Sequence, residues 1–230
     1  MRLTFAALAL FASLGFTPAL AADAQPFITA KDVDLTRFLP APPANDSVQT
    51  KAEIAELLTI QASRTPAMEA AARADAVENV WRFADVLGPK FNEATLPAFS
   101  AFFARVVETE GAVVDPAKDY WKRPRPHMLN KDVKPVVKLS TSGAWPSGHS
   151  TVGYLMATVL ASMVPEQRDA LFARAAAYAE NRIIGGIHYR SDTVMGRTAG
   201  ALIAQRLFLD ADFQAGYGPA RAELRAALGL

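Results

Sequence analysis

The 230-residue chain is 51% hydrophobic and 20% charged, and its formal net charge is +1. These values exclude a disordered chain, which would have low hydrophobicity, and argue against a nucleic-acid-binding protein, which would have a basic excess. The absence of cysteine excludes thiol catalysis and cysteine-ligated metal centres. The length suits one domain with a sizeable core.

Residues 1–21 have the pattern of a signal peptide. Arg2 is the only charged residue before Asp23, residues 3–16 are apolar, and Ala19-Leu-Ala21 offers a cleavage site between small residues. The alternative is a retained membrane anchor, but the apolar run is shorter than the ~20 residues that a span needs. We therefore expect a mature chain that begins near Ala22 and lies in the periplasm.

Residues 22–45 are expected to form an extended lead-in. This segment contains four prolines, which disfavour regular helix: Pro26, Pro40, Pro42 and Pro43. The remainder, residues 46–230, shows no internal repeat and no linker to a second domain. We expect it to fold as one unit.

Residues 46–230 carry helical signals almost throughout. Thr50 and Glu53 fit a capping box, and Thr65-Pro66 fits an N-cap followed by proline in the first turn. Helices are expected from Thr50, from Pro66 to about 86, over 97–110, from Asp115-Pro116, and over 150–163, 165–184 and 192–209, followed by a last amphipathic stretch to Leu230. Only residues 133–139 resemble a strand, and weakly. The prediction is an all-α, single-domain helical bundle.

The segment 139–165 has no formal charge, so a membrane span is an alternative interpretation. Its first half contains Ser, Thr, Gly and His, which is too polar for lipid. A buried core helix is the better interpretation.

Three segments carry residue types suited to binding and transferring a phosphoryl group. The first, residues 118–126 (KDYWKRPRP), holds four basic residues, and its prolines should turn the chain extended and fix the direction of Arg125. Arginine can hold two phosphate oxygens and lysine supplies a point charge. A solvated basic face would produce the same composition.

The second segment is Trp145-Pro-Ser-Gly-His-Ser-Thr151, just before a long apolar run. The N-terminus of a helix presents free N–H groups to an anion, and Gly148 lets the backbone come close. His149 could donate a proton to a bound group. Taken alone, this segment fits an ordinary serine cap equally well.

The third segment, residues 182–192, places His188 and Asp192 four residues apart, so that they would share one face of a helix. A carboxylate bound to one imidazole nitrogen fixes the tautomer and leaves the other nitrogen free to attack. A surface His–Asp pair is the alternative. The combination of the three segments favours the functional interpretation, because two of only three histidines fall within them, as do Lys118, Arg125 and Arg182. Such a set indicates phosphoryl transfer without a metal ion or other cofactor, since two His and one Asp are few metal ligands.

The pattern Lys-x6-Arg-Pro, Pro-Ser-Gly-His and Arg-x5-His-x3-Asp resembles the three-part signature of the type 2 phosphatidic acid phosphatase superfamily. Within it, the chain is similar to the class A bacterial non-specific acid phosphatases, including residues 39–43 (LPAPP). The resemblance implies the all-α acid phosphatase/vanadium haloperoxidase fold and a metal-independent phosphomonoesterase. The cationic residues of the three segments, without a ligand set for a metal, also predict inhibition by phosphate and vanadate. The resemblance is compatible with a homodimer.

The resemblance assigns roles to the residues of the three motifs. His188 would be the nucleophile that carries a phosphohistidine, Asp192 its orienting partner, and His149 the general acid and then the base. The remaining residues would bind phosphate oxygens: Lys118, Arg125, Ser147, Gly148 and Arg182. Asn181 departs from the serine usual before the third-motif arginine, and we expect a tuned rather than an inactive site. His127 receives no role.

Three rival functions share parts of this pattern. A vanadate-dependent haloperoxidase uses the same anion site, but the chain is short and matches the phosphatase class better at its ends. A membrane lipid phosphatase would need spans or an exposed amphipathic helix, which the mature chain does not show clearly. A non-enzymatic phosphate-binding protein would need neither a nucleophile nor an acid. No segment has the pattern of a nucleotide or sugar pocket, so the sequence does not name the physiological ester.

Overall fold

The computed structural model describes residues 24–230, and all regular elements within this range are helices. This confirms the predicted all-α class. Residues 133–139 lie in an irregular loop, so the weak strand expected there was wrong. The predicted signal peptide lies outside the described residues.

The helix starts follow local capping chemistry. Helix α2 (Val48–Ser63) begins after Ser47, whose side chain accepts a hydrogen bond from the Thr50 N–H, so the expected capping box at Thr50 was misplaced. Helix α3 (Pro66–Ala74) is capped by Thr65, as predicted. It ends at Ala74 rather than near residue 86. A 3-10 turn (Val80–Phe83), the short α4 (Ala84–Leu87) and a second 3-10 turn (Glu93–Thr95) follow it.

Helix α5 (Pro97–Trp121) is longer than expected, because Pro116 lies inside it rather than opening a new helix. Proline lacks an N–H and therefore leaves the carbonyl four residues earlier without its helical partner. That carbonyl, of Ala112, instead accepts a hydrogen bond of 3.1 Å from the Ala30 N–H. The lead-in thus supplies the donor that α5 lacks.

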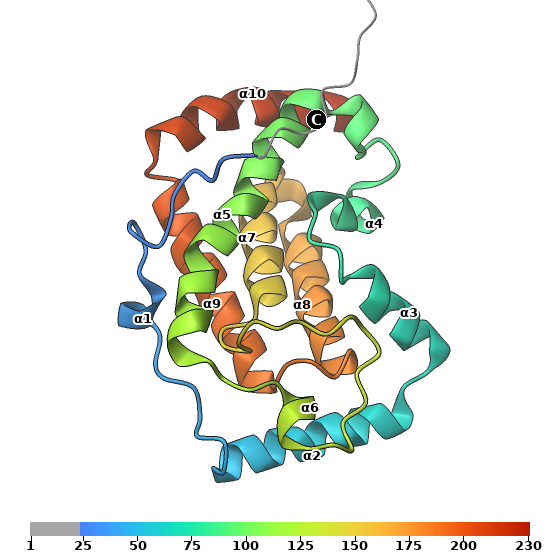
Figure 1. Ribbon diagram of the computed structural model, residues 1–230. Coiled ribbons are helices and arrows are strands. Elements are labelled where there is room, and N and C mark those ends of the chain that lie inside the picture. Colours follow the sequence, from blue (N-terminus) through green and yellow to red (C-terminus); the bar gives the residue numbers. More distant parts are fainter. Residues whose placement is uncertain (1–23) are drawn as a thin grey trace, which may run out of the picture.

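The N-terminal lead-in contains regular structure and contributes to the core, rather than being extended throughout. Residues 24–45 contain one helical turn, α1 (Leu35–Phe38), and bury four side chains in the main core: Ile28, Val33, Leu35 and Leu39. In Figure 1 this segment passes along α5 and α9 before it reaches α2.

The centre of the bundle is α7 (Gly148–Met163), which packs between α8 (Arg168–Ile184) and α9 (Arg190–Leu207) (Figure 1). Helix α5 and α10 (Ala211–Leu228) complete the core. Gly196 and Gly200 let α9 approach α7 closely, since a Cβ atom would lie 2.6 Å from the Ser147 carbonyl oxygen and 2.7 Å from that of Thr151. The uncharged segment 139–165 is therefore a loop followed by a core helix, and no helix within residues 24–230 is long and apolar enough to cross a membrane.

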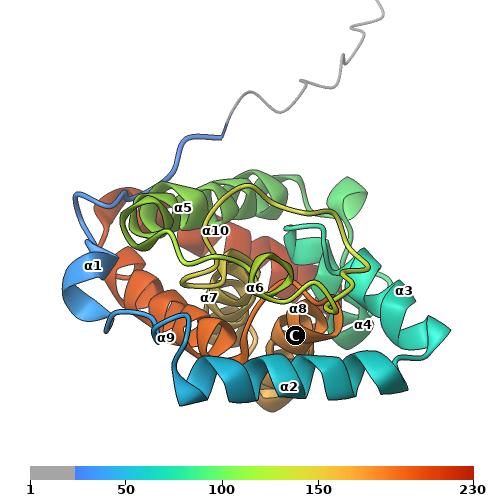
Figure 2. The same cartoon turned by 60° about the horizontal axis from the view of Figure 1, so that its bottom comes forward.

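One end of the bundle brings the three sequence motifs together. The C-terminal ends of α5 and α8, the N-terminal ends of α7 and α9, and the short α6 (Pro126–Leu129) all lie there, beside the loop 130–147. Figure 2 shows α2 running across this end of the molecule. The three motifs therefore meet in space, although the first and last of their residues, Lys118 and Asp192, are 74 positions apart in the sequence.

Candidate active site

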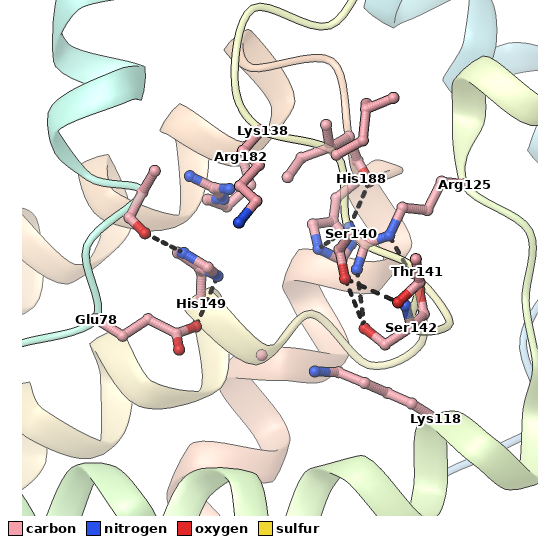
Figure 3. Close-up of a pocket in the computed structure, with 14 residues that line it drawn as sticks. Glu78, Lys118, Arg125, Lys138, Ser140, Thr141, Ser142, His149, Arg182 and His188 are labelled. Carbon is pink, nitrogen blue, oxygen red and sulfur yellow. Dashed lines mark hydrogen bonds and ion pairs between the residues drawn. The ribbon is translucent and has the colours of Figure 1, made fainter.

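A cavity of about 560 Å³ opens at this end of the bundle (Figure 3). Its lining comes from the loop 75–79, the end of α5 and the residues that follow it, the loop 138–142, the start of α7, the end of α8 and the residues between α8 and α9. The polar and charged lining residues are Glu78, Lys118, Arg125, Lys138, Ser140, Thr141, Ser142, His149, Arg182 and His188. Six sequence-predicted residues line the cavity: Lys118, Arg125, Gly148, His149, Arg182 and His188.

His188 lies at one wall of the cavity, and its side chain is 2% exposed. Its Nδ1 is 3.1 Å from the Asp192 Oδ2, which also accepts a 2.9 Å hydrogen bond from the Tyr189 N–H. The predicted contact is present, but the two residues do not share a helix face. His188 precedes α9, and Asp192 lies in the first turn of α9, where a carboxylate accepts from free N–H groups.

The tautomer of His188 follows from its second neighbour. The Nη1 of Arg125 is 3.1 Å from the Nε2 of His188, and a guanidinium can only donate. The Nε2 atom is therefore the acceptor, and the ring proton is on Nδ1, facing Asp192. Burial, together with the charges of Arg125 and Arg182, lowers the pKa of His188 well below its ordinary value. The imidazole is neutral, and the lone pair on Nε2 accepts the hydrogen bond from Arg125.

Arg123 binds the second carboxylate oxygen of Asp192, the one that does not contact His188. Its Nη1 lies 2.5 Å from the Asp192 Oδ1 and its Nη2 lies 3.2 Å from the Glu53 Oε2, while its guanidinium stacks 4.0 Å above the Tyr189 ring. Burial raises the pKa of Asp192, and the charge of Arg123 and the Tyr189 N–H act against this rise. Three donors on one carboxyl group favour its ionised form.

His149 lies at the opposite wall of the cavity in Figure 3 and is 21% exposed. Its Nδ1 is 2.7 Å from the Glu78 Oε1, and its Nε2 is 3.1 Å from the carbonyl oxygen of Ala76. Both neighbours are acceptors, so this geometry favours a proton on each nitrogen and a positively charged ring. Burial raises the pKa of Glu78, but the hydrogen bond and charge of His149 outweigh it and the pKa is lowered overall.

Three buried or nearly buried cations surround the space between the histidines. Burial lowers the pKa of Arg182 to about 10, which leaves it charged at neutral pH, and its Nη1 donates to the Asp75 carbonyl oxygen at 3.3 Å. Lys118 approaches Gly148 so closely that a Cβ atom there would lie 2.8 Å from its Nζ. Arg125 completes the set. Together they form a cluster of positive charge next to the first N–H groups of α7, an arrangement that suits an anion.

Comparisons with known proteins agree with this site. The sequence profile of the PAP2 superfamily matches residues 97–214, which contain all three motifs. The chain belongs to the PAP2 superfamily. It is 32% identical to the non-specific acid phosphatase of Salmonella typhimurium over 87% of this chain and 84% of that protein. It is also 32% identical to the corresponding enzyme of Salmonella typhi, over 89% and 86%.

A third relative with the same activity in its name is the acid phosphatase of Zymomonas mobilis, 30% identical over 63% of this chain and 56% of that protein. Among solved structures, a transmembrane PAP2-type phosphatidylglycerolphosphate phosphatase from Bacillus subtilis matches with a TM-score of 0.54 and 21% identity. The match covers 81% of this chain and 97% of that protein, and at this identity it supports the fold alone. The protein is thus a PAP2-type hydrolase of the acid phosphatase kind.

Two residues flagged by the sequence occupy supporting positions in this PAP2 site. Ser147, expected to bind phosphate, is fully buried; it caps α7 by accepting from the Ser150 N–H and does not line the cavity. Asn181 donates a 2.7 Å hydrogen bond to the buried Asp75, the residue whose carbonyl oxygen holds Arg182. The asparagine therefore connects to Arg182 through Asp75.

His127, which received no role from the sequence, lies on α6 and outside the cavity lining. Burial and the charge of Arg125 lower its pKa. It is the natural control for substitutions of the other two histidines.

Sequence reasoning missed several residues of this PAP2 site. Glu78, which pairs with His149, lies in a loop outside the three motifs, and one glutamate among many carries no local signal. The sequence named Glu53 only as part of a capping box and gave Arg123 no partner, because their contacts span 70 and 69 positions of the chain and leave no local signal. Lys138, a further cation of the lining, stands in the segment first interpreted as strand-like.

Proposed function

We propose that this acid phosphatase hydrolyses phosphate monoesters through a phosphohistidine at His188. The observation that carries the proposal is the orientation of its imidazole: Nε2 is kept free of a proton by a donor, Arg125, and Nδ1–H points to Asp192. A nucleophile needs such a fixed tautomer with its lone pair toward the substrate.

In the first step, the Arg125 N–H leaves His188 Nε2 and turns to a phosphoryl oxygen. The freed Nε2 lone pair forms a bond to phosphorus as the bond from phosphorus to the ester oxygen breaks. The leaving oxygen takes a proton from His149, which the contacts with Glu78 and Ala76 favour in its charged form. Release of the proton from Nε2 requires the bond to the Ala76 carbonyl to break, while Glu78 keeps Nδ1 in place. Asp192 offsets the positive charge that develops on the phosphorylated ring.

In the second step, a water molecule attacks phosphorus and the P–N bond breaks, which restores the neutral His188. The now neutral His149 takes the proton from this water and becomes charged again. Phosphate leaves the site, and both histidines have returned to their initial protonation states.

Charge on the phosphoryl oxygens is offset by Lys118, Arg125 and Arg182, with the Gly148 N–H at the start of α7. In this proposal Ser147 acts indirectly, by capping α7 and thereby fixing the direction of that N–H. Because protein cations perform this task, we expect turnover to persist in EDTA. Phosphate and vanadate should inhibit, because both are anions that suit the same set of donors.

The test is a rapid acid quench of the enzyme during turnover of a phosphate ester labelled in the phosphoryl group. We expect label on His188 that survives alkali, no label and no turnover in His188→Ala, and normal labelling in the control His127→Ala. Label on a serine, or turnover without labelled protein, would contradict the phosphohistidine.

We further propose that the enzyme is exported and forms a homodimer. The pattern of residues 1–21 supports export to the periplasm with cleavage near Ala22, which N-terminal sequencing of exported protein would test. A homodimer is compatible with the resemblance and would be tested by light scattering.

A further inference from the structure

The cavity holds one cation more than phosphoryl binding requires. A monoester dianion carries two negative charges, and Arg125, Arg182 and Lys118 already surround the place where it would lie. Lys138 is a fourth cation of the lining, and unlike the other three it is exposed. In Figure 3 its side chain enters from the same side of the view as Arg182.

Among the residues that the structure describes, Lys138 has no carboxylate partner that would compete with a ligand. Lys118 is paired with Asp115 at 3.2 Å and Arg182 donates to the Asp75 carbonyl, whereas within residues 24–230 no carboxylate lies within ion-pair distance of the Lys138 Nζ. Glu78, the one carboxylate of the cavity lining, is bound to His149. The ammonium of Lys138 is therefore available to a ligand.

The loop that carries Lys138 is held at both sides. The Val136 N–H donates to the Gly185 carbonyl at 3.1 Å, and Arg125 donates to the Ser142 carbonyl at 3.1 Å and to its hydroxyl at 3.3 Å. Lys138 lies between these two anchors, so the backbone fixes the region of the cavity that its ammonium can reach.

The cavity also has room for more than a phosphoryl group. Its volume of about 560 Å³ is of the size that holds a whole small molecule. A leaving group would extend from the phosphoryl site toward the open rim, where Lys138 lies.

We propose that Lys138 forms a second anion subsite, which makes this enzyme favour phosphate monoesters whose leaving group carries its own negative charge, such as a carboxylate or a second phosphate. The inference rests on the proposed function and adds to it a class of substrate. Lys138 acts on specificity and takes no part in the chemical steps.

The experiment compares esters with and without a second anionic group: 3-phosphoglycerate with glycerol 3-phosphate, and propane-1,3-diol bisphosphate with its monophosphate. The measured quantity is the ratio of kcat/KM within each pair. We expect this ratio to fall by about 2- to 5-fold in Lys138→Gln, mainly through KM, which is the size of effect expected for a partly exposed charge pair. The ratio should be largely kept in Lys138→Arg and should fall further in Lys138→Glu.

Lys131→Gln is the matched control, because it removes the same charge from an exposed position of the same loop outside the lining. Its ratio should equal that of the unchanged enzyme. If one pair responds and the other does not, the subsite is assigned to that anion alone. Equal ratios in Lys138→Gln and the unchanged enzyme for both pairs would overturn the inference while leaving the phosphatase proposal intact. If the enzyme hydrolyses none of the four esters, the proposed function is overturned, and this inference with it.

Discussion

The two histidine walls of the cavity are built in opposite ways. The His188 wall is sealed: the side chains of His188, Asp192 and Arg123 are 2%, 0% and 1% exposed, and charged hydrogen bonds join them to Glu53. The His149 wall is open, with His149 21% and Glu78 36% exposed.

This difference matches what each imidazole must do in the proposed reaction. A nucleophile benefits from one tautomer and one direction of attack, which burial and a fixed network provide. A residue that gives a proton and takes one back must exchange it with the leaving group and with water, which requires access. The surroundings of each ring therefore support its role as much as the ring itself does.

The largest effect is expected from breaking the sealed wall at Asp192. An amide at this position cannot offset the charge on the phosphorylated imidazole, and its NH₂ group cannot accept from the donors that the carboxylate now satisfies. We expect Asp192→Asn to lower kcat by about 10²- to 10⁴-fold, as for loss of the carboxylate in other His–Asp pairs. Steady-state kinetics and phosphoenzyme trapping would measure this, with the exposed Asp119→Asn as the control. A loss below about 3-fold would show that the contact with Asp192 is only structural.

An intermediate, selective effect is expected at the open wall. Without its acid, His149→Ala should lose about 10²- to 10³-fold on alkyl phosphates, whose alkoxide leaving group needs a proton. It should lose much less on p-nitrophenyl phosphate, because p-nitrophenolate leaves without protonation. The ratio of kcat/KM for the two esters is the measurement. An equal loss on both would mean that His149 only binds phosphate.

The smallest effect is expected on the pH dependence of stability. It should come from Glu110, which lies against Gly148 at the start of α7. Glu110 is buried with its Oε1 lacking a hydrogen bond among the described residues, and burial raises its pKa to about 8. A Cβ atom on Gly148 would lie 2.8 Å from that oxygen, so Glu110 packs against the first residue of α7. We infer that it is neutral at mildly acid pH.

The sign of the resulting pH effect follows from proton linkage. Between the ordinary pKa of 4.5 and about 8, the folded chain holds this proton and the unfolded chain does not, so stability falls as pH rises through this window. Glu110→Gln should remove that component, and its Tm should fall a few degrees less than that of the unchanged enzyme between pH 5 and pH 8. Calorimetry would measure this, with the exposed Glu108→Gln on the same helix as control. Parallel decreases in Tm would mean that Glu110 is ionised in the fold.

The same contrast separates what the sequence predicted from what it missed. The three motifs carry their residues in short, ordered segments with strong local chemistry, and all three meet at one cavity. Glu78 pairs with His149 across 71 positions of the chain, and no periodicity or spacing in the sequence connects two such residues. Local sequence patterns predict which functional side chains a segment carries. They do not predict which distant residues the fold places in contact with those side chains.

Helix boundaries illustrate the same limit. The sequence predicted a new helix at Asp115-Pro116, because proline normally occupies a first turn. It could not predict that the Ala30 N–H would satisfy the carbonyl that Pro116 leaves free within α5. The contact between His188 and Asp192 was predicted correctly, although through the wrong local geometry.

Arg123 also has a consequence for how the enzyme assembles. Its hydrogen bonds reach Glu53 and Asp192 across 70 and 69 positions of the chain, one toward each end. Closing such long loops costs entropy before any contact repays it, so this ion cluster should form late in folding. An emerging chain that lacks α9 would hold Arg123 and Glu53 without the aspartate that completes them. Catalytic competence should therefore appear only once α9 is available to fold, and no fragment that ends before Asp192 should have the activity.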